Sequence, residues 1–259
     1  MPNLNLISLY RNLKQSPYED FLRSLTVGNT KIIPKYKFFS EIVQSLLQYK
    51  IKYGVNPHQA VREIRKASVT ERSQFLKVKQ LIYGGYYQYF FLASFIWFYF
   101  YHFKLTLGAS GPTNTMYFIF IWQLLGLASL SALGYFIHKK LFSPFYYFFY
   151  SAYMLRALLQ ISRPVSEVLC SAKLHHLDKY KEFKSQKERI YLLIQELKLR
   201  GQIPMDEWDY LIQELWDHFE LNLIKFNKQL QILKLISLTV FILPSFLYLM
   251  FSSISQMGF

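Results

Sequence analysis

Side chains that could perform chemistry are few in this sequence, and their spacing suits no catalytic site. His175 and His176 are adjacent, so on a helix their rings would point about 100° apart, which suits a shared metal ion poorly. Asp217 and His218 are also direct neighbours, and do not share one helix face. Cys170 is the single cysteine, which excludes an internal disulfide and a cysteine-based zinc site.

Short motifs that bind phosphates, dinucleotides or zinc are missing as well. The sequence has no Gly-rich phosphate loop ending in Lys-Ser/Thr, no HExxH, no Gly-x-Ser-x-Gly and no GxGxxG. We therefore predict no catalytic residue, no cofactor and no metal site, and a protein that is not an enzyme.

Acidic residues recur along one stretch near the C-terminal end of the chain. They are Asp206, Asp209, Asp217 and Glu220. On a helix they would lie opposite the apolar residues of the same stretch. Two interpretations remain open: a solvated face, or an interface for a basic partner protein.

The element that carries these residues is predicted to run from Pro204 to Ile254. Pro204, followed by acidic residues, is typical of a helix start. Up to Lys234, apolar residues recur in steps of three or four, which predicts one buried stripe. The stripe consists of Trp208, Leu211, Leu215, Phe219, Leu223, Phe226, Leu230 and Leu233. Residues 235–251 are uncharged and, with their flanks, long enough to cross a bilayer, with a kink expected at Pro244.

Two earlier stretches are also predicted to span a membrane. Residues 86–107 are so rich in aromatic side chains that they would present a bulky wall to lipid. Residues 116–137 instead carry many small side chains, which let neighbouring helices approach closely. We assign membrane-helix packing to Gly126, Ala128, Ala132 and Gly134, together with Pro244 of the last span. Gln123 is expected to make an interhelical hydrogen bond rather than to line a substrate path.

The charge distribution predicts the topology. The net charge of +14 could suggest nucleic acid, but lysine and arginine lie in two blocks that flank the apolar spans. Residues 108–114 and 255–259 carry none of them. The positive-inside rule then places the N-terminus in the cytoplasm and the C-terminus outside, with the lipid bilayer as a partner and no nucleic acid.

The predicted fold class is an all-α membrane protein. Three transmembrane helices accompany a cytoplasmic antiparallel helical bundle whose last helix continues into the C-terminal span. The predicted divisions are an N-terminal cytoplasmic helical region, 1–85, a two-span hairpin, 86–138, a cytoplasmic helical domain, 139–232, and the last span with a short tail, 233–259.

Shorter helices are expected within these divisions. One runs over 36–54 to Gly54, and another follows Pro57. Residues 68–71 have capping-box spacing and are expected to start a third helix, which ends before Gly84-Gly85. Ser143-Pro144 is expected to open a further helix in which Arg156 argues against a membrane span.

The arrangement resembles the F-domain family of type II secretion, type IV pilus and tight-adherence (Tad) pilus systems. In that family an apolar helix ends in a Gly-x-Pro-Leu-like turn, followed two residues later by Ala-Leu. Here residues 162–169 (SRPVSEVL) follow the apolar helix, with Ser162 where Gly is usual. Residues 54–61 (GVNPHQAV) look like a second, degenerate copy.

The resemblance covers residues 145–254, and 36–84 more loosely. Gly201 with Ile203, then the long helix and the last span, is similar to the turn, helix and terminal span of the family. The Gly-Glu pair common in the family is replaced here by Leu197-Lys198, so a role of that carboxylate does not carry over. The order of parts is most like that of the short Tad-type members.

The resemblance implies a platform protein of the bacterial inner membrane, with several spans. It would couple a cytoplasmic hexameric secretion ATPase to the extrusion of pilin subunits, as a homo-oligomer or a hetero-oligomer with a paralogous platform protein. Two other classes remain open: a small membrane channel or transporter subunit, and a membrane scaffold. The spans carry no ionisable residue near their centres, which argues against coupled transport.

Overall fold

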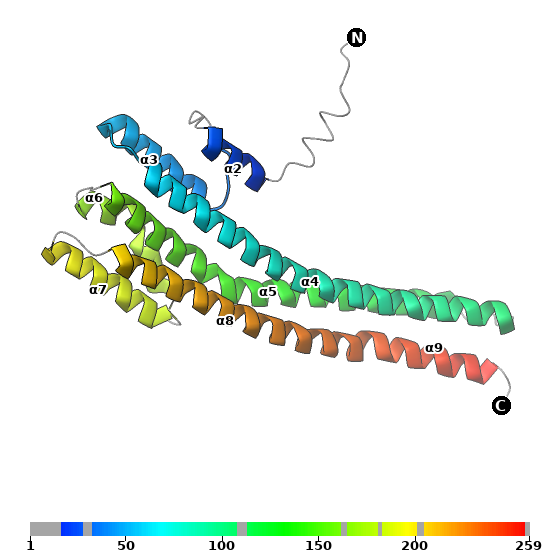
Figure 1. The fold of residues 1–259 in the computed structure, drawn as a ribbon. Helices are drawn as coiled ribbons and strands as arrows, with labels where there is room; N and C mark the ends of the chain where they lie inside the picture. Colours follow the sequence, from blue (N-terminus) through cyan, green and yellow to red (C-terminus); the bar gives the residue numbers. More distant parts are fainter. Residues whose placement is uncertain are drawn as a thin grey trace, which may run out of the picture. The chain divides into compact units, whose positions relative to one another are not determined.

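The structure, a computed structural model, describes residues 17–27, 33–107, 113–161, 165–180, 183–200 and 205–256. Within these ranges every regular element is helical, which confirms the all-α prediction for the described part of the chain (Figure 1). The elements in order are α2 (Pro17–Val27), α3 (Phe39–Tyr53), α4 (His58–Leu107), α5 (Thr113–Gln160), α6 (Val165–Ser171), the 3₁₀ segment η1 (Leu174–Lys179), α7 (Lys184–Arg200), α8 (Met205–Ser237), the π-helical segment η3 (Leu238–Ile242) and α9 (Leu243–Gln256).

The chain forms two compact units, each built from two separate stretches. Unit 1 combines Met1–Ser73 with Pro144–His218, and unit 2 combines Gln74–Ser143 with Phe219–Phe259. The long helices α4, α5 and α8 therefore each contribute residues to both units.

Unit 1 is a helical bundle with an aromatic core. Trp208, Phe145, Phe148 and Phe183 are fully buried, and the Phe145 and Phe183 rings meet edge to face with centroids 4.9 Å apart. Aromatic pairs in this geometry stabilise a core beyond their area alone. The predicted stripe of α8 thus lies in a core at Trp208, and also at Leu211 and Leu215.

Polar contacts join the segment just before α3 to α4 inside unit 1. The Tyr36 hydroxyl donates to Glu71 Oε2 at 2.7 Å, and Lys37 pairs with the other oxygen of the same carboxylate. Burial raises the pKa of Tyr36, and the negative charge of Glu71 raises it further. The far end of α3 closes as predicted at Gly54, whose φ of 68° suits glycine and whose N–H donates to the Lys50 carbonyl at 2.9 Å.

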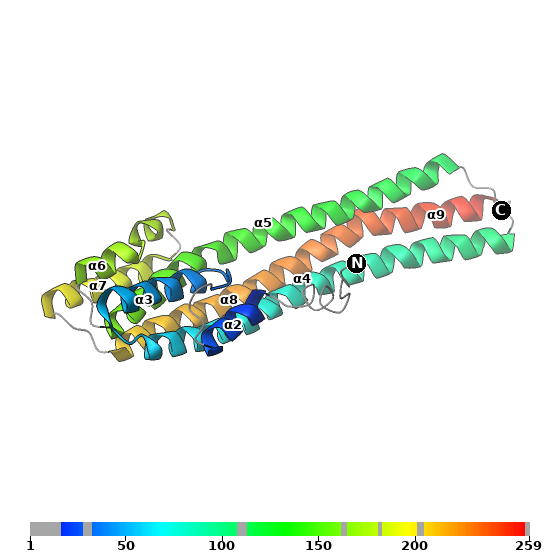
Figure 2. The same cartoon turned by 90° about the horizontal axis from the view of Figure 1, so that it is seen from above.

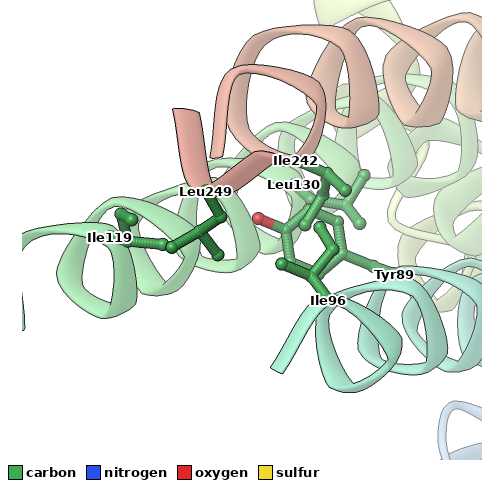
Figure 3. Close-up of a cluster of buried hydrophobic side chains, with 6 residues drawn as sticks. All are labelled: Tyr89, Ile96, Ile119, Leu130, Ile242 and Leu249. Carbon is green, nitrogen blue, oxygen red and sulfur yellow. The ribbon is translucent and has the colours of Figure 1, made fainter. Parts of the chain in front are cut away.

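Unit 2 contains α4 from Gln74 onward, α5 up to Ser143, α8 from Phe219 onward, and all of η3 and α9. These helices lie side by side along their length (Figures 1 and 2). Their buried core is a small cluster contributed by α4, α5, η3 and α9 (Figure 3). It comprises Tyr89, Ile96, Ile119, Leu130, Ile242 and Leu249.

Two predicted breaks in α4 are wrong. The helix runs without interruption from His58 to Leu107, through both Ser68 and Gly84-Gly85. Ser68 is fully buried, and its hydroxyl donates to the Arg65 carbonyl in the preceding turn of the same helix. Ser68 therefore does not cap a new helix. Two glycines cost an α-helix only about 1 kcal/mol each, which tertiary packing readily outweighs.

The predicted helix start at Ser143-Pro144 is also wrong. Pro144 lies inside α5, which continues on both sides of it. Proline removes one backbone hydrogen bond, yet residues beyond it such as Phe145 and Phe148 are fully buried. Their packing offsets the lost bond.

Two of the described helices are long and apolar enough to cross a membrane: Met116–Gln160 and Met205–Ser252. They contain the second and third predicted spans. The aromatic stretch 86–107 of α4 is not among the two, because tyrosine and tryptophan are less apolar than leucine or isoleucine. Its crossing of the membrane stays a prediction.

Candidate functional site

The four acidic residues of the predicted interface differ in their surroundings. Asp206 is exposed in the first turn of α8, and Asp217 is exposed and accepts a bond from the Gln213 amide one turn earlier at 2.9 Å. Asp209 instead pairs with Arg156 Nη2 at 2.6 Å. Glu220, in unit 2, accepts from the Gln74 amide at 2.8 Å and lies 3.8 Å from the Lys77 ammonium. All four side chains are exposed, and among the described residues only Asp209 and Glu220 of this set form ion pairs.

Arg156 joins three helices of unit 1. Its guanidinium contacts Glu63 of α4 at 2.9 Å and Asp209 of α8 at 2.6 Å, while only 16% of the side chain is exposed. Gln160, one turn later on α5, donates to the same Glu63 carboxylate at 2.7 Å. A partly buried arginine needs such partners, because leaving its charge unpaired would be costly.

Gly126 is a point of close approach between helices of unit 2. A Cβ at this position would lie 2.1 Å from Tyr89 Oη and within 2.7 Å of two atoms of Phe241. Those two residues belong to α4 and η3, so glycine lets both neighbours come against α5. The Ser237 hydroxyl of α8 also donates to the Gly126 carbonyl at 3.4 Å.

The other small residues of the predicted packing set divide into two groups. Gly134 is buried, and a Cβ there would meet only ordinary contact with Leu230, at 3.8 Å. Ala128 and Ala132 are exposed in the structure of the single chain. Gly126 and Gly134 therefore face the interior of unit 2, and the two alanines lie on its outer surface.

Gln123 makes the predicted interhelical hydrogen bond. Its side-chain oxygen accepts from the Trp97 indole of α4 at 2.8 Å, and its backbone carbonyl accepts from the Tyr89 hydroxyl at 2.8 Å. Tyr89 is labelled in Figure 3, within the apolar cluster. The Gln123 amide nitrogen is buried without a hydrogen-bond partner among the described residues. These bonds tie α5 to α4 inside an otherwise apolar core.

Pro244 is the second residue of α9 and closely follows the π-helical segment η3. The Leu243 N–H donates to the Leu238 carbonyl, the i to i−5 pattern of η3. Because proline has no N–H, Pro244 cannot donate to the Val240 carbonyl four residues earlier. The Trp122 indole N–H of α5 donates to that carbonyl at 3.2 Å. The expected kink site is thus a π-helical turn supported by a side chain from another helix, a feature often found at functional sites.

These contacts hold helices together. Among the described residues, no three histidine, cysteine, aspartate or glutamate side chains are grouped to hold a metal ion. The arrangement can position helices in an apolar medium and present charge on unit 1.

Two of the pairings described above were not anticipated from sequence. An arginine within the aromatic stretch of α5 signals that acidic partners are needed, but it does not say which. For Trp122, the signal was a proline in an apolar helix, which must leave one carbonyl short of a donor.

No family model, curated protein or solved structure matches this chain. The resemblance to the F-domain family therefore stays a prediction carried by its turns and the order of its helices.

Proposed function

We propose that this protein is a platform protein of the bacterial inner membrane that couples a cytoplasmic secretion ATPase to pilin extrusion. One observation carries the proposal. Helices α4 and α5, and the continuous helical segment formed by α8, η3 and α9, each carry charge in unit 1 and a long apolar stretch in unit 2. A protein of this kind needs cytoplasmic helices that are covalently continuous with its membrane helices.

The surface of unit 2 supports three membrane spans. Phe90, Phe91, Phe95 and Phe98 of α4 are each more than half exposed. Contiguous apolar surface of this kind marks a membrane or protein contact. The stretch 86–107 would then cross the bilayer beside the two more apolar helices, with aromatic rings facing lipid.

The proposed contact with the ATPase uses the exposed acidic residues of α8. Exposed charge gives fast, salt-sensitive association, which suits a partner that must bind and release repeatedly. Asp206 and Asp217 are the residues to test, since Asp209 and Glu220 already pair within the chain.

The experiment is a gene replacement in the native bacterium. Deletion of the gene should abolish surface filaments or secretion. The double variant Asp206→Lys/Asp217→Lys should also abolish them, although the variant protein is present at the normal cellular level. The matched control is Glu188→Lys/Glu196→Lys on α7, which makes the same charge change in the same unit on residues with i, i+4 partners.

Capture of the ATPase by the tagged wild-type protein should weaken in the α8 variant and persist in the control. Normal filaments and secretion after deletion would overturn the platform role. A defect on deletion with a normal α8 double variant would reject only the interface.

A further inference from the structure

The lysines of unit 2 are concentrated in a few helical turns. Residues 74–143 and 219–259 contain eight lysines and a single glutamate, with no aspartate and no arginine. Six of these lysines, hereafter the lysine collar, are exposed and come from all three long helices. The collar consists of Lys77, Lys79, Lys139, Lys140, Lys225 and Lys228.

Side-chain contacts place these lysines at one level. The Asn222 amide donates to the Leu141 carbonyl at 3.4 Å, and the rings of His138 and Phe226 lie 6.0 Å apart. These contacts set the collar turns of α5 and α8 beside each other. The pairing of Lys77 with Glu220 at 3.8 Å brings α4 to the same level. The collar is thus one cationic band around unit 2.

A groove of about 140 Å³ begins beside this band. Its lining residues are Ile82, Gly85, Tyr86, Leu130, Ser131, Gly134, Tyr135, His138 and Leu230. His138 directly precedes Lys139, and Ile82 follows Lys79 by three residues, so the collar lies at this end of the groove. Gly134 adds no side chain to the groove, and the nearest atom to a Cβ placed there would belong to Leu230, at 3.8 Å.

The apolar stretch of unit 2 continues away from the collar. Leu130 lies two turns from His138 along α5, and it belongs to the apolar cluster shown in Figure 3. One end of the groove is therefore cationic, and its walls lead towards apolar side chains.

We propose that this groove binds the part of one acyl chain nearest the headgroup of an anionic phospholipid whose phosphate lies on Lys139 and Lys140. The apolar lining suits a hydrocarbon chain and offers little to a free phosphate ion. The excess of lysine favours a headgroup with net negative charge, since each cation near a membrane surface adds to the attraction for anionic lipid. The inference rests on membrane insertion and not on the platform role.

The test uses the purified full chain in a neutral detergent. Native mass spectrometry measures the binding of dioleoyl phosphatidylglycerol and dioleoyl phosphatidylcholine, which share their acyl chains and differ in charge. Wild type should prefer phosphatidylglycerol by about tenfold or more. Lys139→Gln/Lys140→Gln should remove most of this preference.

Two further variants separate the headgroup from the acyl chain. Gly134→Leu would fill the groove, since a Cβ at this position meets no close contact, and it should weaken binding of both lipids. Gly134→Ala serves if the leucine variant does not fold. The charge control is Lys66→Gln/Lys198→Gln, two exposed lysines of unit 1, which should bind as wild type does.

Four results would overturn the proposal. The first is equal affinity of wild type for the two lipids. The second is a charge control that loses as much of the preference for phosphatidylglycerol as Lys139→Gln/Lys140→Gln does. The third is a folded Gly134→Leu variant that binds both lipids as tightly as wild type. The fourth is binding of glycerol 3-phosphate as tightly as phosphatidylglycerol, because the site would then be for a soluble anion.

Discussion

The indole of Trp122 donates its N–H to the carbonyl oxygen of Val240 at 3.2 Å, in the turn before Pro244. A backbone carbonyl in an apolar medium needs a donor, and Pro244 cannot supply one. The Trp122 ring also packs against Phe241, with centroids 5.1 Å apart. Position 122 therefore supports the π-helical turn both by hydrogen bonding and by packing.

The first prediction is a double-mutant cycle at this turn. Trp122→Phe removes the N–H but keeps an aromatic ring, and should destabilise the protein by about 1 kcal/mol. Pro244→Ala restores a backbone donor, so Trp122→Phe should cost less in that background. Thermal unfolding of the four proteins in detergent measures the coupling, and strictly additive effects would mean that the two sites are independent.

The second prediction compares two glycines of α5. Gly126→Ala places a methyl group 2.1 Å from Tyr89 Oη and should destabilise unit 2 by roughly 1–3 kcal/mol. Gly134→Ala meets only Leu230 at 3.8 Å, and should be neutral or slightly stabilising because alanine favours helix. Unfolding temperatures of the two variants test the contrast. Equal stability of both would contradict the close approach at Gly126.

The third prediction concerns the arginine of unit 1. Arg156→Gln leaves Glu63 and Asp209 without their cation and should cost about 2 kcal/mol, less than a fully buried pair because Asp209 is half exposed. The control Arg200→Gln removes a surface i, i+4 pair with Glu196 and should cost less than about 0.5 kcal/mol. Chemical unfolding of both variants is the measurement, and a cost at Arg156 as small as at Arg200 would show that the triad contributes little.

The fourth prediction is a pH dependence at Tyr36. Its pKa is raised by burial, so the folded state keeps the proton at a pH where the unfolded chain loses it. Its contribution to stability is therefore full below the ordinary tyrosine pKa of 10.0 and falls as pH rises above that value. Tyr36→Phe should cost about 1 kcal/mol at pH 8, through the lost bond to Glu71, and the gap from wild type should narrow by pH 11. A gap that is independent of pH would argue against the raised pKa.

The fifth prediction tests the proposed topology. In a Cys170→Ser background, single cysteines are placed at Ser110, Ser255 and Ser185, and intact cells are treated with a membrane-impermeant thiol reagent. The first two should react from outside, whereas Ser185, which is exposed in unit 1, should not. Ser110 lies outside the described residues, so its accessibility is a prediction from charge alone. Reaction at position 185 in intact cells would reject the three-span arrangement.

Local patterns in the sequence were enough to predict several features. The apolar spacing of residues 205–237 predicts a helix with Trp208, Leu211 and Leu215 on a buried face, and these side chains are buried. The run of apolar residues that follows predicts a stretch long enough to cross a membrane. Both rest on periods of three to four residues or on a run of one kind of side chain, which a sequence displays directly.

Helix boundaries and partners were decided by tertiary structure. Gly84-Gly85 and Pro144 are local helix breakers, yet α4 and α5 continue through them. Their local cost is a few kcal/mol, which burial of neighbouring side chains can exceed. The free energy gained by this burial cannot be inferred from a short stretch of sequence, because it depends on contacts with residues far along the chain.

The small residues assigned to membrane-helix packing also show what sequence predicts and what tertiary structure decides. Gly126, Ala128 and Ala132 are all small residues suited to a helix contact. Their positions around α5 determine which of them are buried. Gly126 faces Tyr89 and Phe241, while Ala128 and Ala132 face outwards. The sequence by itself determined that α5 has small faces. Which face meets α4 and η3 was decided by the tertiary structure, because helix rotation depends on how all the side chains of the neighbouring helices fit together.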